Sequence, residues 1–98
     1  MSICNLELIT KHISAFARFS KVYLFGSSII QEETSNDLDL LLIYESYSDD
    51  LIVECKKIRT ELGNLAGMPI DITALSRKET VETNFLKRLN YKYIQVKW

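Results

Sequence analysis

Few of the residues that build linkers, disulfide frameworks or membrane spans occur in this chain. Its 98 residues include one proline, three glycines and two cysteines. No stretch approaches the roughly 18–20 consecutive apolar residues of a membrane-spanning helix, and the N-terminus lacks the basic start and apolar core of a secretory signal peptide. Cys4 and Cys55 stand alone, without the paired spacing of a zinc site. We therefore expect a cytoplasmic protein with reduced thiols and no membrane partner.

The composition is typical of one globular domain. Apolar residues make up 47% of the chain and charged residues 26%, which favours a folded rather than a disordered protein. The length predicts a single domain over residues 1–98, near the lower limit for a self-supporting core. A formal net charge of −1 gives the whole chain no general attraction for nucleic acid or anionic membrane. Residues 87–98 are an exception, with four basic side chains and no acidic one.

Hydrophobic periodicity predicts helices that alternate with strands. Four β-branched or apolar runs are predicted strands: residues 21–25, 38–44, 70–75 and 91–98. Amphipathic spacing and capping signals predict helices over residues 5–19, from Ser48 to Gly67 and from Ser76 to about residue 90, with a further short helix after Gly26. This order indicates an α+β fold with α/β-like alternation: a small mixed sheet with helices mainly on one face.

The apolar positions also predict which side chains face the core. The second strand is almost continuously apolar after its acids, so both of its faces should be covered. The inner stripe of the long helix comprises Leu51, Cys55, Ile58, Leu62 and Leu65. The inner stripe of the last helix comprises Val81, Phe85 and Leu89.

Acidic side chains interrupt two of the apolar strands. Asp37 and Asp39 open the second strand and should project from one face, about 6–7 Å apart, while Asp71 interrupts the third strand. Acids beside an apolar strand are costly unless a cation lies between them, and Mg²⁺ takes carboxylate oxygens together with substrate phosphates. Gly26 and Ser27 offer backbone amides and a hydroxyl suited to phosphate. The pattern favours a metal-assisted site for a nucleoside triphosphate, against the alternative of acids that lie in solvent or pair with Lys and Arg.

The spacing of these residues resembles a known signature. Residues 24–27 (Leu-Phe-Gly-Ser), nine intervening residues and then residues 37–40 (Asp-Leu-Asp-Leu) resemble the motif of the DNA polymerase-beta-like nucleotidyltransferase superfamily. The setting of Asp71, within Pro-Ile-Asp-Ile-Thr, is similar to that of the third acid in this superfamily. The short chain looks like the minimal nucleotidyltransferases, in particular the MntA-like antitoxin type.

The resemblance implies a reaction and a partner. It implies transfer of a nucleoside monophosphate, AMP from ATP, to a hydroxyl group with two Mg²⁺ ions and release of pyrophosphate. Gly26 and Ser27 would bind the nucleotide phosphates, and Asp37, Asp39 and Asp71 would be the catalytic metal ligands. By the same analogy the acceptor would be a tyrosine of a HEPN-type toxin, which makes this chain the antitoxin.

Ser28 departs from this pattern, because many minimal members have an arginine after Gly-Ser. Lys21, Arg59 and Arg77 are candidates to replace that cation, and the sequence does not choose among them.

Three alternative functions stay open at this point. The chain could be a catalytically inert module that neutralises its partner by contact. It could modify an antibiotic hydroxyl, with a homodimer supplying the pocket. It could add nucleotides to nucleic-acid 3′ ends through its basic, aromatic C-terminal segment, although such segments more often pack within a fold than bind nucleic acid.

Overall fold

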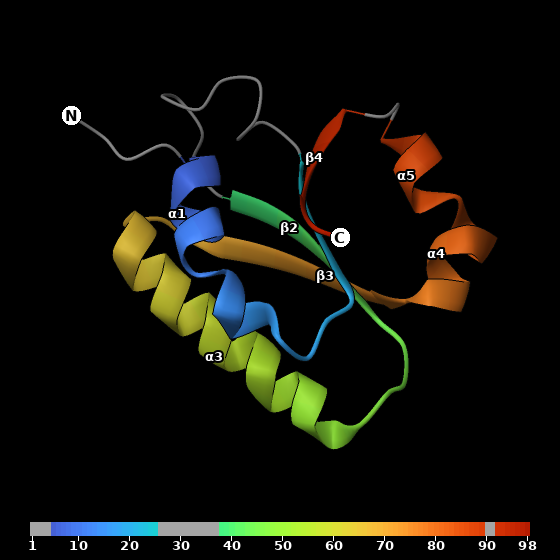
Figure 1. Ribbon diagram of the computed structural model, residues 1–98, viewed down its shortest axis with the longest axis horizontal. Helices are drawn as coiled ribbons and strands as arrows, with labels where there is room; N and C mark the ends of the chain where they lie inside the picture. Colours follow the sequence, from blue (N-terminus) through green and yellow to red (C-terminus); the bar gives the residue numbers. More distant parts are fainter. Residues whose placement is uncertain (1–4, 26–37, 90–91) are drawn as a thin grey trace.

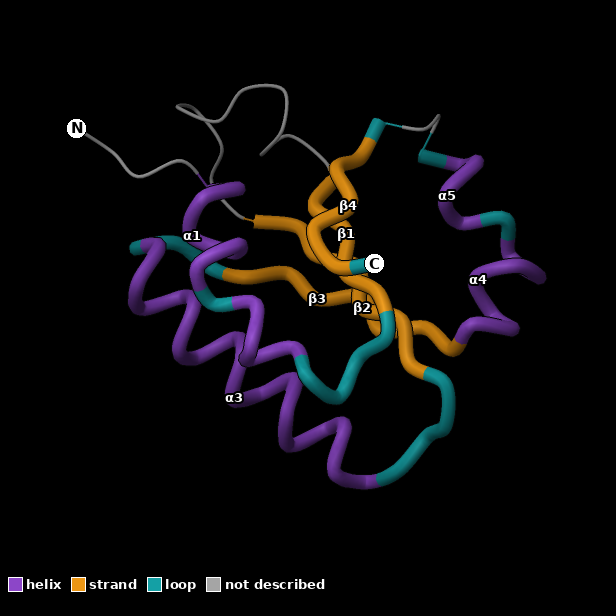
Figure 2. The backbone as a smooth tube through the Cα atoms, in the orientation of Figure 1, coloured by secondary structure: helices purple, strands orange, loops and turns teal. Residues whose placement is uncertain are grey.

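A mixed, four-stranded sheet forms the centre of the molecule (Figure 2). The computed structural model describes residues 5–25, 38–89 and 92–98. The strands in these ranges are β1 (Lys21–Phe25), β2 (Leu38–Tyr44), β3 (Ile70–Ser76) and β4 (Tyr93–Lys97). Their order across the sheet is β3-β2-β1-β4. β2 is parallel to β3, and β1 is antiparallel to both β2 and β4, so the predicted mixed sheet is confirmed.

Helices cover mainly one face of this sheet, as predicted. The helical elements are α1 (Asn5–Lys11), the 3₁₀ helix η1 (Ile13–Phe16), α3 (Asp49–Ala66), α4 (Arg77–Thr83) and α5 (Phe85–Arg88). α1 and α3 pack side by side over one face, while α4 and α5 lie beyond the other side of the strands (Figure 1). No helix in the described part of the chain is long and apolar enough to cross a membrane.

β2 is buried on both faces, which explains its continuous apolar sequence. Leu40, Leu41 and Leu42 have no solvent-exposed surface. Leu40 and Leu42 belong to the larger core cluster, under α1 and α3, whereas Leu41 joins Tyr23 and Ile43 in a smaller cluster on the opposite face. The central strand therefore couples two separate layers of apolar packing.

The long helix α3 ends where the sequence predicts. Gly67 adopts the left-handed conformation with φ of 69°, and its N–H donates to the carbonyl oxygen of Gly63 at 2.9 Å. At the other end Ser48 is the N-cap residue, but its side chain makes no capping hydrogen bond. Its hydroxyl instead accepts a hydrogen bond from Arg18, at 3.3 Å.

A capping box begins α4, as predicted. The Ser76 hydroxyl accepts the backbone N–H of Glu79 at 3.0 Å, and the Glu79 carboxylate accepts the backbone N–H of Ser76 at 3.0 Å. Tyr44, at the end of β2, also donates its hydroxyl to this carboxylate at 3.2 Å. These hydrogen bonds to the ionised form, from Ser76 first and Tyr44 next, lower the pKa of Glu79.

Two predicted helices are interrupted. The predicted helix over residues 5–19 is α1 followed by the separate 3₁₀ helix η1, and the predicted last helix is divided into α4 and α5. The second break lies at Asn84, which has a left-handed backbone with φ of 52° and closes α4 as Gly does in other helices. The short helix expected after Gly26 lies outside the described residues.

Two predicted core positions are wrong. Leu65 is 57% exposed and Val81 is 72% exposed. In α3 the inner stripe continues from Leu62 by four residues to Ala66, which packs against the core, and so passes over Leu65. Val81 does not reach the core because the break between α4 and α5 reorients the chain. Of these two helices only α5, with Phe85 and Leu86, contributes apolar side chains to the cluster on this face.

We predict that Ser76→Ala lowers the free energy of unfolding by about 1 kcal/mol, because the first turn of α4 loses its N-cap acceptor. Urea denaturation followed by circular dichroism measures the change. Ser46→Ala, in the exposed bend after β2, is the matched control and should be close to neutral. Equal effects of the two substitutions would contradict the role of the capping box.

The lowered pKa of Glu79 predicts a pH-dependent contribution to stability. A carboxylate whose pKa is lower in the folded state stabilises that state above its unfolded pKa of about 4.3 and loses this contribution as the pH falls through the folded pKa. Glu79→Gln should therefore be less stable than the parent near neutral pH, and the difference should shrink on acidification below about pH 4. Glu82→Gln on the same helix, which pairs only with Lys78 at the surface, serves as the control. A Glu79→Gln difference that stays constant with pH would exclude this assignment.

Candidate active site

Two of the predicted acids lie side by side on the parallel strand pair. Asp39 of β2 and Asp71 of β3 are direct register partners, so their side chains project from the same face of strands about 4.8 Å apart. The side chain of Asp39 is half-buried and that of Asp71 is exposed. Leu40 and Ile72, which follow them, point to the opposite face and pack with the larger core. The carboxylates therefore lie on the face away from α1 and α3.

Aromatic side chains continue this row across the sheet. Phe25 of β1 is the register partner of Asp39, and Tyr93 of β4 is the register partner of Phe25. The ring of Phe85 packs edge-on against Phe25 at a centroid distance of 5.7 Å. One half of the row is thus acidic, and the other half is aromatic and covered by α5. This arrangement places an anionic site beside an apolar wall.

The remaining predicted site residues, Gly26, Ser27 and Asp37, lie outside the described residues. Gly26 directly follows Phe25, the last residue of β1, and Asp37 directly precedes β2. The two strand ends to which the chain joins them, Phe25 of β1 and the start of β2, lie next to Asp39 and Asp71 in the sheet. Their own positions stay a prediction from the sequence.

Two of the candidate replacement cations lie away from the row. Lys21 is the register partner of Ile43, four residues further along β2 than Asp39, or about 13 Å along the strand. Arg77 follows the far end of β3, where its guanidinium lies 3.5 Å from the Glu45 carboxylate. Neither residue is placed to contact phosphates held at the two carboxylates.

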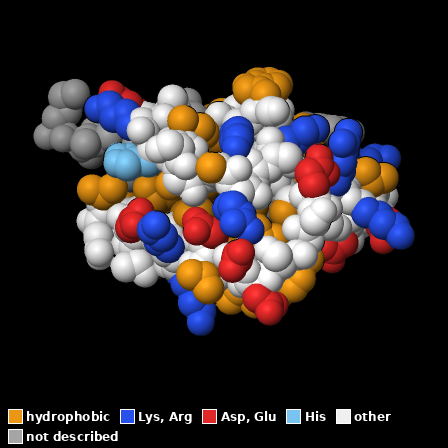
Figure 3. All heavy atoms as spheres, turned by 60° about the horizontal axis from the view of Figure 1, so that its bottom comes forward, with side chains coloured by type: hydrophobic (Ala, Val, Ile, Leu, Met, Phe, Trp, Pro, Cys, Tyr) orange, Lys and Arg blue, Asp and Glu red, His pale blue; other side chains and the backbone are white. Residues whose placement is uncertain are grey.

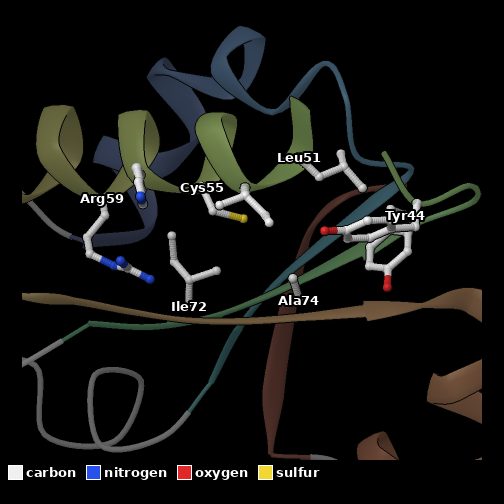
Figure 4. A pocket seen from close by; sticks show the side chains of 9 residues that line it. Tyr44, Leu51, Cys55, Arg59, Ile72 and Ala74 are labelled. Atoms are coloured by element: carbon white, nitrogen blue, oxygen red, sulfur yellow. The ribbon is translucent and has the colours of Figure 1, made fainter. Parts of the chain in front are cut away.

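The third candidate cation, Arg59, lies on the opposite side of the sheet. It lines a groove of about 280 Å³ between α3 and β3 together with Ile72 and Ala74, whose side chains point away from the carboxylate face (Figure 4). The three cations suggested by the sequence are therefore all distant from the acidic row. The sequence could not exclude these cations, because it does not show on which face of the sheet each side chain lies.

Sequence reasoning missed the cations of α5. Lys87 and Arg88 form the last turn of this helix, whose Phe85 packs on the row beside Asp39. The basic run was visible in the sequence, but only the break at Asn84 turns its helix toward the sheet. Two positive charges therefore lie on the side of the sheet that carries the carboxylates.

The C-terminal strand β4 packs within the fold, while Trp98, which follows it, is 84% exposed. Tyr93 packs edge-on against Tyr23 with ring centroids 5.1 Å apart, and the Lys97 ammonium donates to the carbonyl oxygen of Phe16 at 2.9 Å. Burial raises the pKa of Tyr23, with Tyr93 adding to the shift. These contacts favour the packing alternative over a base-stacking surface.

The donor set at the row suits magnesium. Mg²⁺ is commonly held by one or two carboxylates together with substrate phosphates and water, and Asp39 and Asp71 provide two carboxylates at adjacent register positions. Within the described ranges, no group of three or more His, Cys, Asp or Glu side chains could hold a metal by itself. A metal at this row would therefore need the substrate, or a residue outside those ranges, to complete its ligands.

No protein-family model and no curated protein matches this sequence. Three solved structures share the fold at low sequence identity. A toxin–antitoxin complex with AMP-PNP superposes with a TM-score of 0.64 at 17% identity, over 96% of this chain and 73% of the matched chain. A mutant of the MntA-HpeT toxin–antitoxin complex gives 0.61 at 17% identity, over 87% and 68% of the two chains.

The third structure comes from Shewanella oneidensis and contains a tri-AMPylated HEPN toxin in complex with an MNT antitoxin. It superposes with a TM-score of 0.56 at 14% identity, over 95% of this chain and 71% of the matched chain. At such identities the likeness establishes the fold alone. This chain has the fold of the minimal nucleotidyltransferases.

Proposed function

We propose that this protein is a magnesium-dependent nucleotidyltransferase that moves AMP from ATP to a hydroxyl group. The observation that carries the proposal is the direct register pairing of Asp39 with Asp71 on the face of the sheet away from α1 and α3. Strand pairing holds the backbone positions of the two residues side by side before any ligand binds, and such preorganisation favours phosphoryl transfer.

The reaction needs little covalent help from the protein. The acceptor oxygen attacks the α-phosphorus of ATP, a new P–O bond forms, and the bond from the α-phosphorus to the bridging oxygen breaks as pyrophosphate leaves. Bound Mg²⁺ would neutralise the negative charge that develops on the phosphates and the leaving group. Asp39 and Asp71, with Asp37, would hold the metal ions, and the exposed Asp71 carboxylate would help to take the proton of the attacking hydroxyl. Gly26 and Ser27 would bind the phosphates.

The proposed acceptor is a tyrosine of a HEPN-type toxin. Two observations on structurally similar proteins support an adenine nucleotide and a HEPN-type partner: one complex contains the ATP analogue AMP-PNP, and another contains an AMPylated HEPN toxin with an MNT antitoxin. The exposure of Asp71 agrees with it, because an acceptor carried by a large partner must reach the carboxylates from outside. The antitoxin role follows if modification inactivates the toxin.

We predict that Asp39→Asn and Asp71→Asn each lower AMP transfer by about 10²–10⁴-fold, because each removes a charged metal ligand and Asp71→Asn also removes a proton acceptor. Incorporation of α-phosphate-labelled ATP into a co-purified partner measures the rate. Asp49→Asn, an exposed acid at the start of α3, is the matched control. Thermal stability of Asp39→Asn should be unchanged or higher, since repulsion between neighbouring carboxylates is relieved.

Activity of Asp39→Asn equal to that of Asp49→Asn would contradict the catalytic role, and a large loss of thermal stability would make the acid structural. Absence of label with the parent protein, combined with inhibition of the partner in a stoichiometric mixture, would favour the inert binding module instead.

Metal dependence forms a separate prediction. Removal of divalent ions with EDTA should abolish transfer, and Mg²⁺ should restore it while Ca²⁺ does not, because Ca²⁺ favours longer metal–oxygen distances and looser geometry than phosphoryl transfer needs. Initial rates of pyrophosphate release, measured during metal titration, report this requirement. Transfer that persists at full rate in excess EDTA would contradict it.

A further inference from the structure

The groove between α3 and β3 lies on the face opposite the carboxylate row. It has a volume of about 280 Å³ and an apolar floor of Ile72 and Ala74. Tyr44 and Leu51 lie at one end and Arg59 at the other, with Cys55 between them (Figure 4). From Leu51 to Arg59 the helix rises about 12 Å, so the groove holds a few side chains rather than a large ligand.

One wall of the groove is a stripe of α3 that extends past the sheet. Ile52, Lys56 and Arg59 are spaced four and three residues apart and line the groove, so they share one face of the helix. Each follows a residue of the inner stripe that packs against the core. Ile52 nevertheless remains 49% exposed. The helix therefore overhangs the sheet on this side and leaves space beneath it.

The strand under this overhang is at the edge of the described sheet. The order β3-β2-β1-β4 leaves the outer side of β3 without a strand partner among the described residues. The N–H and C=O groups on such an edge form a template for another strand, and edge addition is a recurrent way to recognise extended peptides. An added strand would direct alternate side chains into the groove, parallel to those of Ile72 and Ala74.

The charges of the groove indicate what such a strand should carry. Lys56 and Arg59 form no ion pair with any described carboxylate, although acids and bases alternate over the neighbouring surface of α3 (Figure 3). A carboxylate at the cationic end and apolar side chains over the floor would complement both parts of the groove.

We propose that this groove binds an extended acidic–apolar segment of another protein, which adds as a strand to the free edge of β3. A second copy of this chain fits less well. The β3 residues that line the groove are Ile72 and Ala74, and neither of them is acidic. Two copies paired through β3 would therefore leave Lys56 and Arg59 without a strand-borne partner. The proposal concerns binding and does not depend on the transferase activity.

A titration with designed peptides tests this inference. The probes are the acetylated peptide Thr-Asp-Thr-Val-Thr-Val-Thr and its reverse sequence, which cover parallel and antiparallel addition. In ¹⁵N NMR spectra of the whole chain, one of them should shift the amides of β3 and of residues 51–59, with a Kd of about 1 mM or lower. The version with Asn in place of Asp should bind at least about tenfold more weakly.

Matched variants separate the groove from the rest of α3. Lys56→Gln and Ile52→Glu, on the groove, should weaken binding by about tenfold or more, because they remove a cation or add an opposing anion. Lys57→Gln and Val53→Glu are the controls, since Lys57 lines a different cavity, next to η1, and Val53 is 62% exposed. Circular dichroism confirms that each variant is folded.

The proposal is wrong if neither peptide shifts these amides, or if Lys56→Gln and Lys57→Gln bind the peptide equally well. It is also wrong if the Asp and Asn peptides have the same affinity. Sedimentation of the free protein as a dimer that Ile52→Glu converts to monomer would show that a second copy occupies the edge, which would overturn the choice of partner.

Discussion

The parallel pairing of β2 with β3 determines most of what this molecule presents to its surroundings. The register runs from Leu38 opposite Ile70 to Tyr44 opposite Ser76 without interruption. A parallel pair cannot be joined by a tight turn and needs a crossover, and α3 is that crossover. Because side chains alternate along a strand, a slip of one residue would move Asp71 from the carboxylate face into the layer under α3. Burial of the apolar partners therefore maintains the register that brings the acids together.

The position of the acids along the strand has a physical reason. Leu40, Leu41 and Leu42 are fully enclosed, and an unpaired carboxylate among them would be strongly destabilising. Asp39 is the second residue of β2, between the enclosed Leu38 and Leu40, and its side chain projects from the opposite face and keeps partial access to solvent. The buried segment provides the rigid support, and the strand end provides the place where charge is tolerated. Functional groups at strand ends are common in sheet proteins for this reason.

Much of the fold was predictable from the sequence, because its signals are local. The apolar run of β2, the Ser76–Glu79 capping box and the glycine at the end of α3 each act within a few residues, and all three were found as expected. The break at Asn84 was not predictable, since a left-handed asparagine competes with a helical pattern that continues on both sides of it. The exposure of Val81 follows from that break.

The site was predictable only in part. The helix predicted between the second and third strands made it plausible that these strands lie close together, and strand pairing places Asp39 and Asp71 at the same register position. The positions of the cations relative to the carboxylates could not be predicted, because the side of a sheet on which an arginine lies depends on tertiary packing. The groove under Arg59 was invisible in the sequence for the same reason, since it arises from the overhang of one helix over a strand edge.

The alternation of side chains in β3 links two surfaces that otherwise have nothing in common. Asp71 and Thr73 belong to the carboxylate face, while Ile72 and Ala74 belong to the groove. A segment paired with the edge of β3 would have every second side chain under α3 and the intervening ones beside Asp71, at steps of about 6.8 Å. In such a partner the residue numbers of an anchor in the groove and of an acceptor beside Asp71 would differ by an odd number. The pleat of β3 would thus determine how far apart the anchor residues and the acceptor residue must be in the sequence of the partner.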